Sequence, residues 1–229
     1  MNDQKHQRRV RSFVLREGRL TPGQKRALEE MLPRYGLPDP PERIDPSAVF
    51  GRRAPLTVEV GFGNGDVLAH LAAAHPERDF VGIEVHRPGV GRLLRHVRDA
   101  GLENLRVSTR DAVEVLEQQL PAGSIDRLLI FFPDPWPKKR HHKRRLIQPG
   151  FAEMAASRLA PDGRLHLATD WEDYRDHMLD VLDACPALVN TAGPGGTVAR
   201  PADRPVTHFE QRGQRKGHGV WDLVYEKAF

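Results

Sequence analysis

The sequence predicts an α/β fold in which a mostly parallel sheet carries helices on both faces and ends in an antiparallel last strand. Short apolar runs alternate with helical segments from Leu56 onward, and the loops between them are short. Strands connected in this way pair in parallel, because each intervening helix returns the chain to the same end of the sheet. A Gly-rich turn follows the first run, and the C-terminal part breaks the alternation. At 229 residues, the chain accommodates one such domain with a basic N-terminal extension.

The N-terminal extension is expected to contain a basic arm, a helix and a connector. Thr21 is a helix-capping residue followed by a proline, and residues 24–32 continue as a helical run. Residues 36–55 are rich in Pro and Gly, which is typical of a connector. We therefore assign 1–55 to the arm, helix and connector, and 56–229 to the main domain.

Five apolar runs of the main domain are expected to form parallel strands, each followed by a helix. The strands are expected at 56–60, 79–85, 104–109, 125–132 and 164–170, and the helices at 66–74, 89–100, 112–119, 148–159 and 174–184. Residues 191–219 are polar and rich in Gly and Pro. Residues 219–227 (GVWDLVYEK) are expected to join the sheet as an antiparallel edge strand, because no crossover helix precedes them.

Composition excludes several classes of protein. No apolar run reaches the roughly 18 residues that a membrane-spanning helix needs, and the N-terminus lacks the apolar stretch of a secretory signal. Cys185 is the only cysteine, so we expect no internal disulfide and interpret it as a small apolar side chain near a helix end. We expect a cytoplasmic protein with no membrane association and no obligatory protein partner.

Positive charge is concentrated in two segments, although the net charge is only +4. Residues 1–26 contain eight Lys or Arg and two acids, and residues 138–145 contain six Lys or Arg and no acid. Such clustering is typical of a surface that binds a polyanion. The alternative for 138–145 is a solvated basic loop.

The turn after the first strand, EVGFGNGD (59–66), has the features of a nucleotide site. Gly61, Gly63 and Gly65 let the backbone turn tightly and approach a ligand closely. A dinucleotide fingerprint would have glycine at position 66, where this chain has Asp. An acid there disfavours a pyrophosphate but is compatible with the sulfonium and amino group of S-adenosylmethionine. The alternative is a tight turn that binds nothing.

Three acids near strand ends strengthen the prediction of S-adenosylmethionine as cofactor. Glu84 lies about twenty residues beyond the glycines, where a carboxylate accepts the ribose hydroxyls. Asp111 follows the third strand, where it either contacts the adenine amino group or caps the next helix. Glu59 lies inside an apolar strand, so it either forms a structural ion pair or faces the ligand amino group.

The fourth strand ends in FFPDPWPKKRHHKRR (131–145). Its three prolines stiffen the backbone around Asp134 and Trp136 at the ligand-binding edge of the sheet. A rigid carboxylate, an aromatic ring able to stack on a base and a run of cations together suit a purine attached to phosphates. His141 and His142 have no carboxylate or thiol at ligand spacing, so no metal site is expected.

At this point the chain resembles the bacterial tRNA (guanine-N(7)-)-methyltransferases. The matching stretches are RSFVLREGRLTPGQ (11–24), VEVGFGNG (58–65), FVGIEVH (80–86), FFPDPWPKKRHHKRR (131–145), LATDWEDY (167–174) and THFEQRGQRKGHGVWDL (207–223). They occur in the same order over nearly the whole chain. The resemblance implies a Rossmann-like class I methyltransferase fold and formation of 7-methylguanosine at guanine 46 of the tRNA variable loop.

The resemblance also implies roles for particular residues. It assigns cofactor contacts to Glu59, Glu84, Asp111 and Asp134, and makes Asp134 the catalytic residue. It assigns substrate contacts to Lys138, Asp170, Thr207, His208, Phe209 and Glu210, and RNA contacts to Arg140, His141, His142, Lys143, Arg144 and Arg145. His208 departs from the pattern, because Lys or Arg is expected there and a neutral imidazole lacks their full charge.

Some interpretations stay open at this level. Asp170 is equally consistent with capping the helix that follows it, and Glu210 is expected to accept hydrogen bonds from the guanine Watson–Crick edge. Trp221 alternates with apolar residues and is expected in the core. Guanine N7 carries a lone pair at neutral pH, so no general base is required, and Asp134 would favour the positive charge arriving on the purine. The rival functions are a methyltransferase for ribosomal RNA or a small molecule, an NAD-dependent dehydrogenase and a non-catalytic RNA-binding module.

Overall fold

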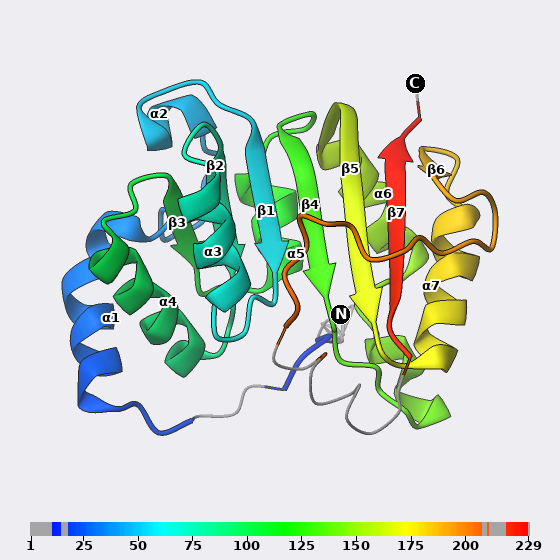
Figure 1. The fold of residues 1–229 in the computed structure, drawn as a ribbon, viewed down its shortest axis with the longest axis horizontal. Coiled ribbons are helices and arrows are strands. Elements are labelled where there is room, and N and C mark those ends of the chain that lie inside the picture. The colour runs from blue at the N-terminus through cyan, green and yellow to red at the C-terminus, as the bar shows by residue number, and fades with distance from the viewer. Residues whose placement is uncertain (1–10, 15–17, 208–209, 211–218, 229) are drawn as a thin grey trace, which may run out of the picture.

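The computed structural model describes residues 11–14, 18–207, 210 and 219–228, and the predicted alternation of strands and helices is present in it (Figure 1). A seven-stranded sheet has the order β3-β2-β1-β4-β5-β7-β6. The strands are β1 (Leu56–Val60), β2 (Asp79–Ile83), β3 (Leu105–Ser108), β4 (Ile125–Phe131), β5 (Leu159–Thr169), β6 (Leu188–Asn190) and β7 (Trp221–Lys227). The first five pair in parallel, and β7 is antiparallel to both β5 and β6.

Helices flank the sheet on both sides. They are α1 (Pro22–Tyr35), α2 (Pro46–Phe50), α3 (Asp66–Ala74), α4 (Arg87–Ala100), α5 (Ala112–Glu114), the π-helix η1 (Val115–Gln119), the 3-10 helix η2 (Lys139–Arg144), α6 (Pro149–Arg158) and α7 (Glu172–Asp183). Strand β4 contributes to both layers: Leu128 and Ile130 join the core formed with η1, α6 and α7, whereas Leu129 and Phe131 join the core formed with α1, α3 and α4. This alternation follows the two-residue period of a strand and confirms the doubly covered sheet.

The last strand enters the sheet antiparallel, as predicted, but the prediction that it forms an edge is wrong. Strand β6 pairs along its outer side, with Leu188 opposite Lys227 and Asn190 opposite Tyr225. Sequence patterning missed β6 because the strand has three residues and its central Val189 is 55% exposed. A segment this short has no recognisable hydrophobic period, so only its pairing partner identifies it as a strand.

The N-terminal helix is joined to the opposite edge of the sheet. Thr21 and Gln24 form a reciprocal capping box that starts α1, as the sequence indicates. The helix runs past Pro33 and packs against α4, and Leu37 then donates its backbone N–H to the carbonyl of Val107 on β3. The division of the chain into an arm, helix and connector at 1–55 and a main domain at 56–229 stays a prediction.

The segment 191–207 covers the part of the sheet that α3 and α4 leave open. In Figure 1 it crosses in front of β7, β5 and β4 toward the carboxyl ends of the parallel strands. Val198 pairs with Asp222 in an isolated bridge, and Thr191 donates to the carbonyl of Val224. Within the described ranges, no helix has both the length and the apolar character needed to cross a membrane.

Candidate active site

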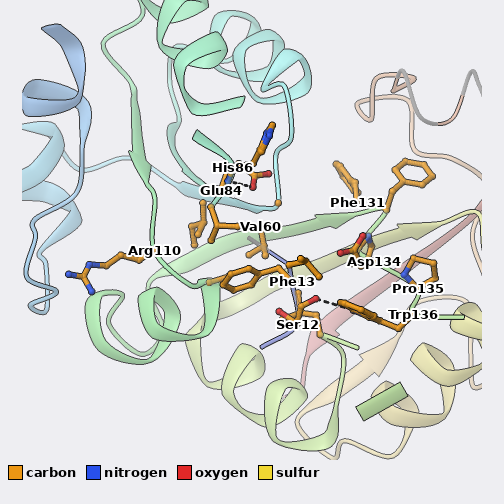
Figure 2. Close-up of a pocket in the computed structure, with 18 of the residues that line it drawn as sticks. Ser12, Phe13, Val60, Glu84, His86, Arg110, Phe131, Asp134, Pro135 and Trp136 are labelled. Atoms are coloured by element: carbon orange, nitrogen blue, oxygen red, sulfur yellow. Dashed lines mark hydrogen bonds between the residues drawn. The ribbon is translucent and has the colours of Figure 1, made fainter. Parts of the chain in front are cut away.

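An open cleft of about 630 Å³ lies at the carboxyl ends of the parallel strands. Its walls come from the Gly-rich turn after β1, the end of β2, the turn after β4 and the N-terminal residues 12–14. Figure 2 shows Glu84 and Asp134 at this cleft, with the ring of Phe13 between Arg110 and Trp136 in that view. Glu84 and Asp134, both predicted near the ends of strands, therefore line the same cleft.

The Gly-rich turn requires glycine for its backbone and for its packing. Gly61, Gly63 and Gly65 have φ values of 73°, 57° and 77°, a region that residues with a side chain rarely adopt. A Cβ on Gly65 would also lie 2.6 Å from Leu93 of α4. A Cβ on Gly89 would lie 2.0 Å from the carbonyl oxygen of Gly63, so α4 and the turn fit together only without side chains at these positions.

Glu84 fixes the turn to the end of β2. Its Oε2 accepts the backbone N–H of Gly63 at 2.9 Å, and its Oε1 accepts that of His86 at 2.8 Å. Each carboxylate oxygen can accept a second hydrogen bond, so these contacts leave capacity for the predicted ribose hydroxyls. The ribose contact itself stays a prediction.

Glu59 is a buried carboxylate without a partner among the described residues. Its side chain is 3% exposed, and its Oε2 accepts no hydrogen bond from the described chain. Burial, and secondarily the charge of Glu84, raises the pKa of Glu59 to about 8. It lines a second cleft of about 350 Å³ together with Gly61 and Thr207. The structure thus gives no support to a structural ion pair, and an unsatisfied acceptor at this position fits the cationic amino group of S-adenosylmethionine.

Asp111 caps helix α5, as one of its two predicted roles requires. Its Oδ1 accepts the backbone N–H of Val113 at 3.0 Å. Its neighbours Arg110 and Ala112 line the main cleft, whereas Asp111 lines an adjacent hollow with Ser12. Contact with an adenine stays a prediction.

The turn after β4 holds Asp134 in a constrained backbone. Phe132 and Trp136 both have positive φ, 53° and 46°, although neither is glycine. Such conformations cost about 1–3 kcal/mol and persist only where the surroundings enforce them. Asp134 lies between them, exposed and facing the main cleft.

The ring of Trp136 is partly occupied by contacts within the protein. Its Nε1 donates to the carbonyl of Ser12 at 3.0 Å, and the guanidinium of Arg144 lies 4.0 Å from the ring centroid. Arg144 also donates to the carbonyls of Arg11 and Phe13. Trp136 and Arg144 therefore fasten the N-terminal segment across the cleft, a role that the sequence did not predict.

Arg145 belongs to the interior, not to the cationic surface. Its guanidinium donates to the carbonyl of Pro135 at 2.9 Å, pairs with Asp173 and lies 4.9 Å from the ring centroid of Tyr174. The hydrogen bond from Arg145 lowers the pKa of Asp173. The RNA contact predicted for Arg145 is therefore incompatible with its position, because only 1% of its side chain is exposed.

The rest of the basic run divides by exposure. Its exposed cations are Lys138, Lys139, Arg140 and Lys143. Burial and the surrounding cations lower the pKa of His141, whose ring packs edge-on against Trp136. His142 lies 3.2 Å from Arg145. Among the residues that the structure describes, no group of His, Cys, Asp and Glu is arranged to hold a metal.

The predicted substrate residues are in different environments. Thr207 lines the second cleft, while Glu210 is buried and forms a two-point ion pair with Arg204, at 2.7 and 3.1 Å. Both oxygens of Glu210 accept hydrogen bonds from Arg204, so the structure gives this carboxylate a partner within the protein, and its contact with the guanine edge stays a prediction. Sequence reasoning missed Arg204, an arginine between prolines in a polar segment that carries no recognisable motif.

The remaining predicted substrate contacts are Lys138 and Asp170. Lys138 is exposed at the start of η2, and Asp170 is half-buried at the end of β5. Helix α7 takes Trp171 as its N-cap residue, and the substrate contact of Asp170 stays a prediction. His208 and Phe209 lie outside the described residues.

The protein is similar to known methyltransferases in sequence and in fold. A family model described as "Putative methyltransferase" matches residues 53–223. A tRNA (guanine-N(7)-)-methyltransferase of Methylococcus capsulatus is 61% identical over 221 residues, which cover 96% of this chain and 95% of the relative. One of Alkalilimnicola ehrlichii is 59% identical over 222 residues, covering 96% and 93%.

Solved structures support the fold. The 16S rRNA methyltransferase KamB superposes with a TM-score of 0.57 at 15% identity, covering 82% of this chain and 95% of that one. A 16S rRNA (adenine(1408)-N(1))-methyltransferase mutant from Catenulisporales acidiphilia gives 0.53 at 16% identity, covering 81% and 92%. These likenesses confirm the Rossmann-like class I fold. Given identities of about 60% over nearly the full length of its relatives, this chain belongs to the tRNA (guanine-N(7)-)-methyltransferase family of S-adenosylmethionine-dependent enzymes.

Proposed function

We propose that this chain transfers the methyl group of S-adenosylmethionine to N7 of guanine 46 in the tRNA variable loop. The observation that carries the proposal is the junction at Asp134. This carboxylate faces the main cleft, and the exposed cations Lys138, Lys139, Arg140 and Lys143 follow it directly in the chain. This arrangement supports a cofactor cleft and a phosphate-binding surface that adjoin each other near Asp134. A cytoplasmic location belongs to the same proposal.

The cofactor half of the site is built from Glu59, Glu84 and the Gly-rich turn. Glu59 supplies the buried negative charge for the amino group, and Glu84 holds the turn while keeping acceptor capacity for the ribose. Asp111 is proposed to add an adenine contact beside its capping role. When bound, S-adenosylmethionine supplies an electrophilic methyl group at its sulfonium.

The chain's part in the reaction is mainly positioning. Guanine N7 already has a lone pair, so no side chain has to remove a proton from it. The prolines and the two positive φ angles around Asp134 hold its carboxylate in a fixed place. From there, it accepts hydrogen bonds from the base or the cofactor amino group and stabilises the positive charge that arrives on the purine.

The acceptor half is proposed to involve Lys138, Asp170 and Thr207. Thr207 lines the second cleft, which shares Gly61 and Phe131 with the main cleft, so both clefts meet over the end of β4. A guanine placed there would lie between Thr207 and the Asp134 turn. Its phosphates would then reach the exposed cations of η2.

The test uses the full chain, tritiated S-adenosylmethionine and unmodified tRNA. We expect label in 7-methylguanosine after digestion to nucleosides, and none when guanine 46 is replaced by adenosine. Label that persists in the replaced tRNA would move the acceptor to another guanine. If label were incorporated only when ribosomal RNA is supplied in place of tRNA, the substrate would be ribosomal RNA and not tRNA.

Asp134→Ala tests the assignment of the catalytic residue. We expect turnover to be abolished and tRNA binding to remain within about threefold, because positioning of the reacting groups is lost while the phosphate contacts stay. Glu153→Ala, at an exposed acid of α6, serves as the control and should match the unmodified chain. A near-normal rate for Asp134→Ala would sink the assignment.

A further inference from the structure

A buried charged cluster lies beneath the segment 191–207, beside the active site and apart from the cofactor residues. Arg204 is its centre, with 1% of its side chain exposed. Glu210 and Asp222 are its two acidic partners, each 2% exposed, and His166 is 5% exposed. The cluster lies against β5 and β7, on the face of the sheet that the segment 191–207 crosses (Figure 1).

One side of the cluster binds the sheet. Arg204 donates from Nη2 to Asp222 Oδ2 at 2.9 Å, and its Nε lies 2.6 Å from Asp222 Oδ1. Asp222 belongs to β7, and its Oδ1 lies 2.8 Å from Nε2 of His166 on β5. An ionised carboxylate only accepts hydrogen bonds, so His166 donates from Nε2. The guanidinium is thus tied to two neighbouring strands.

The same guanidinium packs against the residues that lead into the catalytic turn. It lies 5.7 Å from the ring centroid of Phe131 and 5.9 Å from that of Phe132. Phe131 also packs edge-on against His166, with the centroids 5.0 Å apart. Phe132 has the positive φ that begins the turn, two residues before Asp134.

The other side of the cluster holds residues 205–207, which form one wall of the second cleft. Glu210 pairs with Arg204, and its backbone N–H donates to Oγ1 of Thr207 at 3.0 Å. Thr207 and its neighbours Pro205 and Val206 line this cleft together with Glu59. Arg204 therefore contacts both the wall that faces the acceptor and the chain that carries Asp134.

We infer that Arg204 is a positioning residue: through Glu210 and Asp222 it holds the wall 205–207 at a fixed distance from the Asp134 turn. Glu210 then acts as the anchor of this wall and not as a ligand of the base. The inference rests on the proposed function for the identity of what enters the cleft. A lysine cannot replace Arg204, because one ammonium group lacks the planar fork that donates two hydrogen bonds to Glu210 and one to Asp222.

The test compares Arg204→Lys and Glu210→Gln with the matched control Asp203→Asn. Asp203 is on the same segment, but its partner Arg127 and its own side chain are partly exposed. Four quantities are measured in the full chain: kcat, KM for tRNA, the Kd for S-adenosylmethionine, and amide hydrogen exchange of the peptide spanning 198–207.

For Arg204→Lys we expect kcat to fall about 10- to 100-fold, since a displacement near 1 Å has this effect on a positioned reaction. Cofactor affinity should change less than threefold, and exchange within 198–207 should accelerate. Glu210→Gln should accelerate exchange in the same peptide, and Asp203→Asn should match the unmodified chain. In Arg204→Ala, millimolar guanidinium should restore part of kcat, whereas uncharged urea should not.

Three results would overturn the inference. Normal kcat and exchange in Arg204→Lys would remove the positioning role, and loss of cofactor affinity in step with kcat would make the effect a general loss of folding. If Glu210→Gln lost activity while its exchange stayed normal, Glu210 would be a direct ligand of the base. Absence of 7-methylguanosine with the unmodified chain would reject the proposed function instead, and the exchange comparison would still decide whether Arg204 holds the wall.

Discussion

At the scale of single residues, Glu59 shows how a binding group is kept at the expense of stability. It is buried with an unsatisfied oxygen, and its pKa is raised by burial from the ordinary 4.5 to about 8. Between these two values the folded chain retains a proton that the unfolded chain has released. Stability contributed by the protonated form is therefore lost as the pH rises from about 4.5 to about 8.

Glu59→Gln should consequently stabilise the fold at neutral pH. At pH 7.5 the ionised Glu59 of the unfolded chain must take up a proton on folding, a cost that a neutral amide does not have, so we expect a gain on the order of a few kcal/mol there and little gain at pH 4.5. Urea unfolding of both proteins across this range measures the difference. A difference in the free energy of unfolding that does not change with pH would contradict the role of Glu59 ionisation.

The same pKa predicts a proton release when the cofactor binds. Pairing with a cationic amino group requires the ionised carboxylate, so binding at pH 7 should release up to one proton from Glu59 and tighten as the pH rises toward 8. Calorimetry in buffers of different ionisation enthalpy detects the proton. Glu59→Gln should show none from this site.

Two cations of one basic run should behave differently when removed. Arg145→Ala takes away a buried guanidinium that binds the carbonyl of Pro135, so we expect a loss of roughly 2–3 kcal/mol of stability and a lower kcat. Lys143→Ala removes an exposed cation and should leave stability unchanged while weakening tRNA binding. Thermal melting and tRNA titration separate the two. Equal effects of the two substitutions on tRNA binding alone would place Arg145 on the RNA surface after all.

At the scale of elements, the cofactor cleft depends on how closely α4 approaches the Gly-rich turn. There is no space for a side chain at Gly89, because a Cβ there would lie 2.0 Å from the carbonyl oxygen of Gly63. Because both atoms belong to rigid backbone, an added methyl group must move the helix or the turn. The Gly-rich turn also carries the backbone N–H of Gly63, which donates a hydrogen bond to Glu84.

Gly89→Ala should therefore weaken cofactor binding at least about tenfold, in spite of the higher helix propensity of alanine. Gly150→Ala is the matched control, since that glycine lies in α6 with nothing within 4 Å of an added Cβ. It should stabilise the protein slightly, by about 0.5–1 kcal/mol. Unchanged cofactor affinity in Gly89→Ala would show that α4 can shift without disturbing the site.

At the scale of the whole molecule, cofactor and RNA functions occupy adjoining surfaces at one edge of the sheet. The segment 11–14, held by Trp136 and Arg144, extends over this edge and places the backbone of Arg11 beside Arg144 of η2. The RNA-binding surface is therefore proposed to combine two segments that are more than 100 residues apart in the chain.

Affinity for tRNA should fall steeply with salt, because such binding releases counterions from the phosphates. Replacing Lys138, Lys139, Arg140 and Lys143 together by alanine should reduce the slope of log K against log salt by about 3–4. Filter binding at several salt concentrations measures it. An unchanged slope would place the phosphate contacts elsewhere on the molecule.

Local signals in the sequence determined the parallel strands, the Gly-rich turn and the acids at the strand ends. Hydrophobic period, glycines with positive φ, and the prolines around Asp134 act within a few residues, so Glu59, Glu84 and Asp134 could be predicted at the site without coordinates. Trp221, predicted in the core, is indeed partly buried against it.

Only the tertiary structure decided which charges face solvent and which are buried. Arg145 stands in a basic run but is enclosed by Asp173 and Tyr174, and Glu210 stands in a polar motif but is paired with Arg204. Strand β6 likewise exists because β7 pairs with it. Burial and pairing arise from residues distant in the chain, and the free energy of a charge depends on those neighbours and not on its own sequence context.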